Sequence, residues 1–375
     1  MIPLYKVYMP PNIEDSLIKL LYSERLAFGE HNELFEERLR KYLGTSLVIT
    51  TNTNNSAMIL ALKLAGVKVG DDVLASPISC LATNAPVKTV GANIVWIDVN
   101  PSTGCIDSEK LEGYLTRKTK AIIHYHWVGY PGDINEINSF ARKKGLKVIE
   151  DASEAFGAEY KGRKIGNTNS DFVCFSFNPV RIINTIDGGA LSIRAKDDFE
   201  RAKLLRDYGI DRKKFRDKMG EINPNSDITE AGHHFLMNNL SGYLGFVQIL
   251  DIDRRLKRVR SNARFYDKKL SVIPQLKPLR VSPRKQPSYW VYTILAEDRD
   301  NLLIFLRENQ IYASKVHMRN DIYSCFGPLK NKYPGIEEFS KKYLSIPCGW
   351  WLSKEETKKI TQLIQKFYAN SICSL

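Results

Sequence analysis

The chain has 375 residues, which is long enough for two domains of unequal size. Hydrophobic residues make up 43% and charged residues 26%, and these ordinary values exclude a disordered chain, collagen and a coiled coil. The net charge of +13 is unevenly spread: residues 1–200 hold 23 basic and 24 acidic side chains, and residues 201–375 hold 32 and 18. We therefore expect the C-terminal half to attract something anionic.

The cysteines and the uncharged stretches indicate the compartment. No CxxC pair and no secretory leader accompanies the six cysteines, which are Cys80, Cys105, Cys174, Cys325, Cys348 and Cys373. This pattern predicts reduced thiols and no metal site. The uncharged stretch 73–87 contains two prolines and several polar residues, so it cannot span a bilayer. We expect a cytoplasmic protein without a membrane partner.

Short β-branched runs alternate with helical patterns between about residues 46 and 195. Strands are expected at 46–50, 72–75, 93–97, 120–124, 147–150, 172–175 and 190–193, and helices at 56–65 and 135–144. This alternation predicts an α/β fold, in which helices lie on both faces of a mostly parallel sheet. Ligands of such sheets bind beyond the carboxyl ends of the strands, where Asp151 and Ser176 are expected.

The pattern changes after about residue 232. Helical stretches are expected over 234–270, 299–309 and 353–367, with a strand at 289–295 and an exposed loop at 221–229. This indicates a smaller α+β domain. We expect a large domain over 1–245, a small domain over 246–375, and an N-terminal segment that is free to pack on the small domain.

Three segments at predicted strand ends could carry chemistry, and each also has a simpler explanation. Thr51–Asn55 (TNTNN) could offer backbone N–H groups to a phosphate, or only cap the helix that follows. Glu150 and Asp151 could hold a protonated ring nitrogen or another cation, or be solvated loop acids. The glycines of Cys174–Ala190 (CFSFNPVRIINTIDGGA) suggest close backbone approach, or a plain connection between two strands.

Taken together, these segments resemble the sugar-nucleotide aminotransferases of the DegT/DnrJ/EryC1/StrS family. The resemblance covers nearly the whole chain, and it includes LALKLAGVKVGDDVLASP (60–77), HWVGYPGD (126–133), VIEDASEAFGAEYKGRKIG (148–166), FSFNPVRIINTIDGGAL (175–191) and IPCGWWLSKEE (346–356). It implies the aspartate-aminotransferase fold (type I) with a seven-stranded type of sheet, and the cofactor pyridoxal phosphate. It also implies a keto-sugar nucleotide as substrate, in the synthesis of an amino or deoxy sugar for a surface polysaccharide such as an O-antigen. A homodimer is expected because each site in this family borrows residues from its neighbour.

By position, the resemblance assigns roles around the cofactor. Asp151 would pair with the pyridine nitrogen and keep the ring protonated, which makes the ring an electron sink. Ser176, with Asn55 and Ser56 at the start of a helix, would hold the phosphate. A side chain at Asn54, where family members have a small residue, would crowd it.

Three further positions follow from the same resemblance. Cys80 stands where many members place an aromatic ring over the cofactor. Glu154 stands where many have Gln or His beside the ring oxygen, and an ionised carboxylate there would oppose the phenolate. His234 falls where members reach across the dimer toward the neighbour's phosphate.

The departure with the largest consequence is Arg181, at the family's Schiff-base lysine. A guanidinium has a pKa above ~12, so its neutral fraction at pH 7 is below about 10⁻⁵. A Schiff-base lysine works because its amine can lose a proton. Lys161 and Lys164 lie in an expected hairpin, EYKGRK (159–164), and nothing directs them at Asp151.

Several interpretations of Arg181 stay open. The protein could be an enzyme with altered chemistry that holds pyridoxamine phosphate non-covalently, in the manner of the family's sugar dehydratases that have His in place of the lysine. It could be a non-catalytic paralogue that binds a sugar nucleotide or an active partner, or carry a deliberate Lys→Arg change. Nucleic acid is not an expected partner: the basic run Arg254–Arg260 (RRLKRVR) fits a solvated helix face or a diphosphate contact, and no nucleic-acid motif accompanies it.

Overall fold

A mostly parallel sheet of seven strands forms the centre of the structure, a computed structural model that describes residues 1–327 and 332–372. The strand order is β1-β9-β8-β5-β4-β2-β3, and β9 runs in the direction opposite to the other six strands. The strands are β1 (Val48–Thr51), β2 (Asp72–Ala75), β3 (Asn93–Trp96), β4 (Thr119–Tyr125), β5 (Lys147–Asp151), β8 (Phe172–Ser176) and β9 (Gly189–Ile193). The expected α/β fold and its parallel sheet are confirmed.

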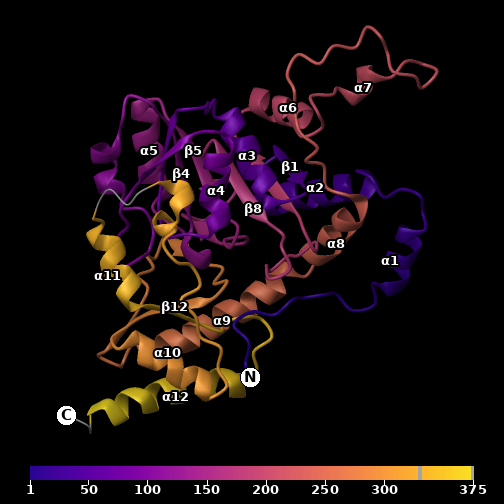
Figure 1. The fold of residues 1–375 in the computed structure, drawn as a ribbon. Helices are drawn as coiled ribbons and strands as arrows, with labels where there is room; N and C mark the ends of the chain where they lie inside the picture. The colour runs from indigo at the N-terminus through magenta and orange to yellow at the C-terminus, as the bar shows by residue number, and fades with distance from the viewer. Residues whose placement is uncertain (328–331, 373–375) are drawn as a thin grey trace.

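Helices cover both faces of this sheet (Figure 1), because successive side chains of its central strands are buried on opposite sides. Val148 and Val173 face the layer that holds α2, α5 and α8. Ile149 and Cys174 face the layer that holds α3, α4 and α6. These helices are α2 (Glu30–Leu43), α3 (Asn54–Leu64), α4 (Leu81–Thr89), α5 (Ile134–Lys144), α6 (Lys196–Leu205) and α8 (Asn239–Ile249).

The C-terminal part has its own antiparallel sheet and its own apolar core. Its elements are α9 (Ile252–Leu270), β10 (Leu276–Pro278), β12 (Tyr292–Ala296), α10 (Arg299–Glu308), β13 (Tyr343–Ile346) and α12 (Lys354–Ile372). The N-terminal residues join this part, since Ile2 pairs with Ile311 and belongs to the same core. The division at residue 245 stays a prediction; the chain changes helix between Ile249 and Ile252.

The remaining elements are short, and Figure 1 labels three of their helices. They are α1 (Glu14–Leu21), α7 (Arg212–Phe215), α11 (Pro334–Lys342), the 3-10 helices 108–114, 127–129, 320–322 and 324–326, and a sheet of β11 (Lys285–Gln286), β6 (Glu159–Tyr160) and β7 (Arg163–Lys164). Residues 207–235, which we call the arm, project from the body and carry α7. The expected exposed loop 221–229 lies in this arm.

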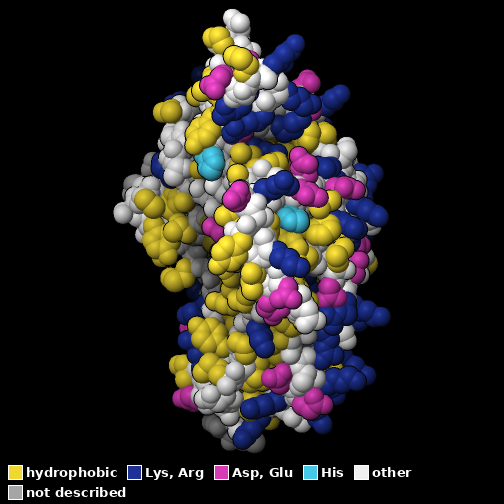
Figure 2. Space-filling model, turned by 90° about the vertical axis from the view of Figure 1, so that its right-hand side faces the viewer, with side chains coloured by type: hydrophobic (Ala, Val, Ile, Leu, Met, Phe, Trp, Pro, Cys, Tyr) yellow, Lys and Arg dark blue, Asp and Glu magenta, His cyan; other side chains and the backbone are white. Residues whose placement is uncertain are grey.

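The arm and α1 leave apolar side chains in solvent. Met219 is 84% exposed, Ile222 60% and Tyr22 85%. Figure 2 views this side of the molecule and shows hydrophobic side chains between basic ones. Such exposure is typical of a surface that meets another molecule.

Three expectations differ from the structure, each for a local reason. The helical pattern over 234–270 is two helices, and the first begins at Asn239 because the Asn238 side chain accepts the N–H of Ser241 at 2.8 Å. The expected strand at 289–295 begins only at Tyr292, after Tyr289 with a φ of +48°. Of the two interpretations of the basic run, the solvated face is wrong for Arg255, which is 2% exposed and donates to the carbonyl oxygens of Ile182 and Gln248.

Candidate active site

Asp151 and Ser176 lie at the ends of the adjacent parallel strands β5 and β8, as the sequence predicts. Asp151 is 1% exposed. Its Oδ2 accepts the hydroxyl of Thr83 at 2.5 Å, and its Oδ1 accepts both the N–H of Ser153, at 3.0 Å, and the Ser153 hydroxyl. The carboxylate is therefore held in one orientation at the carboxyl edge of the sheet.

The turn between β1 and α3 combines a cap with free helix N–H groups. The Thr53 hydroxyl accepts the N–H of Ser56 at 3.0 Å, so the predicted capping is present. The N–H groups of Asn54 and Asn55 have no acceptor within the helix, which is the usual state of a first turn. Asn54 is buried, with an Oδ1 that has no partner among the described residues, whereas Asn55 is exposed.

The same turn touches the start of β9. A Cβ atom on Gly189 would lie 2.5 Å from the carbonyl oxygen of Thr53 and 2.7 Å from the N of Asn54. The close approach suggested for these glycines is thus present. It places the α3 N-terminus beside the end of β8, where Ser176 is 7% exposed.

Glu154 is the centre of a buried polar cluster. Its Oε1 accepts Arg181 Nη1 at 2.9 Å and His317 Nε2 at 3.1 Å, and its Oε2 accepts the hydroxyl of Tyr125. Burial alone would raise the pKa of Glu154, but the electrostatic effects of His317 and Arg181, with hydrogen bonds from His317 and Tyr125, lower that pKa to about 2. Glu154 is therefore ionised at neutral pH, and its charge is compensated inside the protein.

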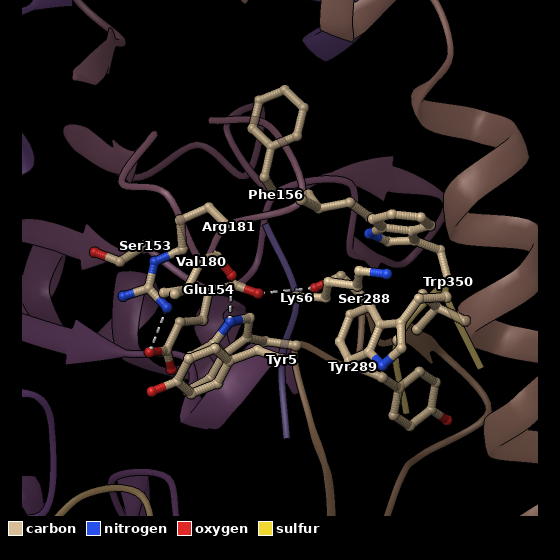
Figure 3. Close-up of a pocket in the computed structure, with 15 residues that line it drawn as sticks. Tyr5, Lys6, Ser153, Glu154, Phe156, Val180, Arg181, Ser288, Tyr289 and Trp350 are labelled. Atoms are coloured by element: carbon tan, nitrogen blue, oxygen red, sulfur yellow. Dashed lines mark hydrogen bonds and ion pairs between the residues drawn. The ribbon is translucent and has the colours of Figure 1, made fainter. Parts of the chain in front are cut away.

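Arg181 is fixed by its surroundings (Figure 3). Its guanidinium lies over the ring of Trp290, 4.6 Å from the ring centroid. Figure 3 shows the same guanidinium meeting the carboxylate of Glu154. The Trp290 indole donates to the carbonyl oxygen of Val180 at 2.8 Å, so the loop of Arg181 and the ring beneath it hold each other. Among the described residues, nothing bonds the buried Nε of Arg181.

The other predicted residues lie in different settings. Cys80 is half-buried at the start of α4, and burial, followed by the charge of Glu154, raises the pKa of its thiol. His234 is exposed, and its carbonyl oxygen accepts the Asn52 side chain at 3.2 Å, near the start of α3 in the same chain. Lys161 and Lys164 lie in the β6–β7 hairpin beside Glu136 and Glu159, away from Asp151.

The sequence interpretation missed Tyr125, His317 and Trp290. Tyr125 ends β4 in register with Asp151, so the strand-end argument applied to one more strand would have found it. His317 and Trp290 come from the C-terminal part, and no local pattern joins them to Glu154.

The described cysteines form no disulfide. The five cysteines within the described residues are free, and Cys373 lies outside them. In residues 1–327 and 332–372 no group of three His, Cys, Asp or Glu side chains could hold a metal ion, and no helix is long and apolar enough to cross a membrane.

Known proteins resemble the chain over nearly its full length. The transaminase for UDP-4-amino-4,6-dideoxy-N-acetyl-beta-L-altrosamine from Campylobacter jejuni (strain 81-176) is 29% identical over 92% of this chain and 91% of its own. GDP-perosamine synthase from Escherichia coli O157:H7 is 27% identical over 91% of both chains. The pleiotropic regulatory protein of Geobacillus stearothermophilus is 28% identical over 96% and 95%.

Solved structures show the same fold. The sugar aminotransferase CalS13 from Micromonospora echinospora superposes with a TM-score of 0.92 at 30% identity, over 98% of this chain and 100% of its own. The protein Spr1654 from Streptococcus pneumoniae, solved in its PMP form, superposes with a TM-score of 0.89 at 22% identity, over 99% and 100%. Aminotransferases of this kind use pyridoxal phosphate or pyridoxamine phosphate. The model of the DegT/DnrJ/EryC1/StrS aminotransferase family matches residues 9–365, and the chain belongs to that family.

Proposed function

We propose that this protein holds pyridoxamine phosphate without a covalent bond and acts on a keto-sugar nucleotide in the synthesis of an amino or deoxy sugar. Relatives that act on UDP-linked and GDP-linked sugars support the substrate class. We further propose a cytoplasmic setting and a surface polysaccharide, such as an O-antigen, as the destination of the sugar. The observation that carries the proposal is the ion pair between Arg181 and Glu154.

The strand-end residues fit the ring and the phosphate of this cofactor. Asp151 is a buried acceptor for a protonated ring nitrogen, and one of its donors, the Thr83 hydroxyl, comes from α4. The N-terminal N–H groups of α3, with Ser176 beside them, suit a phosphate dianion. When bound, the cofactor would supply an electron sink for the substrate, and Asp151 would keep the ring nitrogen protonated.

The cluster at Glu154 does not fit covalent attachment. By resemblance, position 181 belongs to the lysine, and Arg181 has no amine that could lose a proton. Its guanidinium instead neutralises Glu154, which then does not oppose an anionic ring oxygen as strongly as a lone carboxylate would. The residues that we infer to bind and orient the cofactor, and to neutralise Glu154, are thus present. The amine that would form a Schiff base with the cofactor's aldehyde is absent at position 181.

Binding of the two cofactor forms tests this proposal. Calorimetry with the purified protein should show pyridoxamine phosphate binding, with little absorbance change when pyridoxal phosphate is added. Asp151→Ala should weaken pyridoxamine phosphate binding about tenfold or more, whereas Asp197→Ala, at an exposed acid on α6, should not. Equal affinities of the two variants would contradict the role of Asp151.

A second candidate is a non-catalytic regulator that binds a sugar nucleotide or an active paralogue. The likeness to a pleiotropic regulatory protein favours it. If neither cofactor form binds to the folded protein, this candidate replaces the enzyme.

We also propose a homodimer, supported by the exposed apolar side chains of the arm. A groove of about 1670 Å³, with its open mouth included, lies at the base of the arm and is lined by Phe28, Arg206 and His234 among others. In light scattering, Met219→Asp on the arm should lower the measured mass from that of a dimer to that of a monomer. The control Val272→Asp, also at an exposed apolar residue, should leave the mass of the dimer unchanged. A monomeric wild-type protein would refute the dimer.

A further inference from the structure

Two adjacent side chains of α4 join different parts of the molecule. Thr83 is 1% exposed, and its hydroxyl donates to Oδ2 of Asp151 at 2.5 Å. The next residue, Asn84, is fully buried, and its Nδ2 donates to Oδ1 of Asn320 at 2.9 Å. Asn320 belongs to the C-terminal part and lies 236 residues further along the chain. Helix α4 therefore connects the carboxylate at the end of β5 with a segment of the C-terminal part.

The amide of Asn84 is the link from α4 to that segment. Besides Asn320, its Nδ2 meets the carbonyl oxygen of Ser76 at 3.0 Å and the hydroxyl of Ser79 at 2.9 Å. Two N–H bonds are thus shared among three acceptors. The Oδ1 of Asn84 is buried and has no partner among the described residues, a state that costs free energy. Without Asn320, both N–H bonds would stay within the large domain, and the link would be lost.

Asn320 holds the loop before α4 as well. Its backbone N–H donates to the carbonyl oxygen of Pro77 at 2.7 Å, and its Nδ2 donates to the carbonyl oxygen of Ser79 at 3.1 Å. Ile78 and Arg319 form a β-bridge between the same two segments. Because Asn320 is only 2% exposed, water does not compete for these bonds. One asparagine thus fixes both α4 and the loop that leads into it.

The orientation of Asp151 depends on α4. Its Oδ1 is held from within its own turn, by the N–H and the hydroxyl of Ser153. Within residues 1–327 and 332–372, its Oδ2 accepts a hydrogen bond from one donor, the hydroxyl of Thr83. A group that acts on a ligand has to be held within about 0.5 Å of its working position. A displacement of α4 would therefore release the oxygen that we expect to face a bound ring.

The segment of Asn320 also reaches the cluster at Glu154. His317 precedes Asn320 by three residues, and its Nε2 lies 3.1 Å from Oε1 of Glu154. The carbonyl oxygen of His317 accepts the hydroxyl of Tyr343 at 2.7 Å, which anchors the segment in the C-terminal part. Residues 317–320 therefore contact Glu154 directly and Asp151 through α4.

We propose that Asn320 is a positioning residue, which holds α4 in place and through Thr83 fixes the carboxylate of Asp151 toward the cofactor ring. The cofactor ring as the target rests on the proposed function. The hold on α4 rests on the hydrogen bonds of Asn320 alone. Since no hydrogen bond joins Asn320 to Asp151, the effect passes through Asn84 and Thr83.

Calorimetry with two probes isolates this effect. One probe is pyridoxamine phosphate, and the other is its analogue with carbon in place of the ring nitrogen, with which Asp151 cannot pair. The wild type should prefer pyridoxamine phosphate, and Asn320→Ala should lower that preference about 2- to 30-fold. The matched control is Asn262→Ala, at a buried asparagine of α9 that also bonds backbone carbonyl groups of the C-terminal part. It should lower the stability and leave the preference unchanged.

Thr83→Val tests the route of the effect. On its own it should lower the preference by a similar factor. Combined with Asn320→Ala it should lower the preference no further, because both changes release the same carboxylate oxygen. Factors that multiply in the double variant would show that Asn320 acts by another route, and would overturn the proposal. If Asn320→Ala does not fold, Asn320→Ser takes its place, since the shorter hydroxyl cannot reach both Asn84 and Ser79.

Hydrogen exchange without any ligand separates this proposal from the proposed function. The amide protons of residues 81–89 should exchange at least about threefold faster in Asn320→Ala than in Asn262→Ala, because only the first change loosens α4. If pyridoxamine phosphate does not bind the wild type, the proposed enzyme fails, and faster exchange of α4 still supports the hold of Asn320. Equal exchange of α4 in the two variants, or an unchanged preference between the two probes, overturns the positioning role.

Discussion

Replacing Arg181 with lysine should not by itself restore covalent attachment of pyridoxal phosphate at neutral pH. Arg181 Nη1 lies 2.9 Å from the ionised Glu154 carboxylate, and a lysine amine in that loop would meet the same carboxylate. At about 4 Å and an effective dielectric constant of about 20, the attraction is roughly 4 kcal/mol. Opposite charges at such distances raise a lysine pKa by roughly 1–3 units. The neutral amine, which is the nucleophile, becomes about 10- to 1000-fold rarer.

The double variant removes that attraction. In the double variant Arg181→Lys, Glu154→Gln, the amine of the new lysine should lose its proton at a lower pH. The visible absorbance of its imine with pyridoxal phosphate should then appear at a pH roughly 1–3 units lower than in Arg181→Lys alone. Glu154→Gln alone is the control and should give no imine. The assay is an absorbance titration with pH, on samples whose thermal unfolding shows that they are folded. If the single variant forms the imine at the same pH and extent as the double variant, the argument from Glu154 is wrong.

Two further predictions concern stability. The pKa of Glu154 is lowered from 4.5 to about 2, so ionised Glu154 should contribute roughly 3 kcal/mol to the free energy of unfolding. This contribution should be complete above pH 4.5 and lost as the pH falls toward 2. Urea unfolding measured at several pH values should show this loss in the wild type and not in Glu154→Gln. Gly189→Ala should lower the free energy of unfolding by about 1–3 kcal/mol, because its Cβ would meet the backbone of Thr53 and Asn54. In the same denaturant titration, the control Gly113→Ala should cost under about 0.5 kcal/mol, because a Cβ there meets nothing within 4 Å. Equal effects of the two alanines would refute the proposed close packing.

The sequence predicts the sheet and the strand ends because these depend on short-range patterns. Buried β-branched runs with turns between them locate the strands, and the parallel order follows from the helices in between. Local patterns are therefore sufficient to place Asp151 and Ser176 at one edge of the sheet. The roles given to the eight predicted residues, including the phosphate role of Asn55, stay predictions.

The cluster at Glu154 could not be predicted, because its members meet only in the folded chain. His317 lies 163 residues from Glu154 in the sequence, and no periodicity links two such distant side chains. The same holds for Arg255, whose neighbours Arg254 and Lys257 are exposed while it is buried. A run of basic residues shows that charge is present, but which of these side chains are buried depends on the packing of the folded chain.

The docking of the N-terminal segment has a consequence for how the chain folds. Tyr5 stacks on Trp290 and Ile2 pairs with Ile311, so these residues find their partners only after the roughly 300 residues between them have been made. Closing a loop of this length costs about 5 kcal/mol of chain entropy. We expect the segment to dock late and to detach early, without disruption of the central sheet. A truncation that removes Ile2 and Tyr5 would then leave a folded body without the contacts to Ile311 and Trp290.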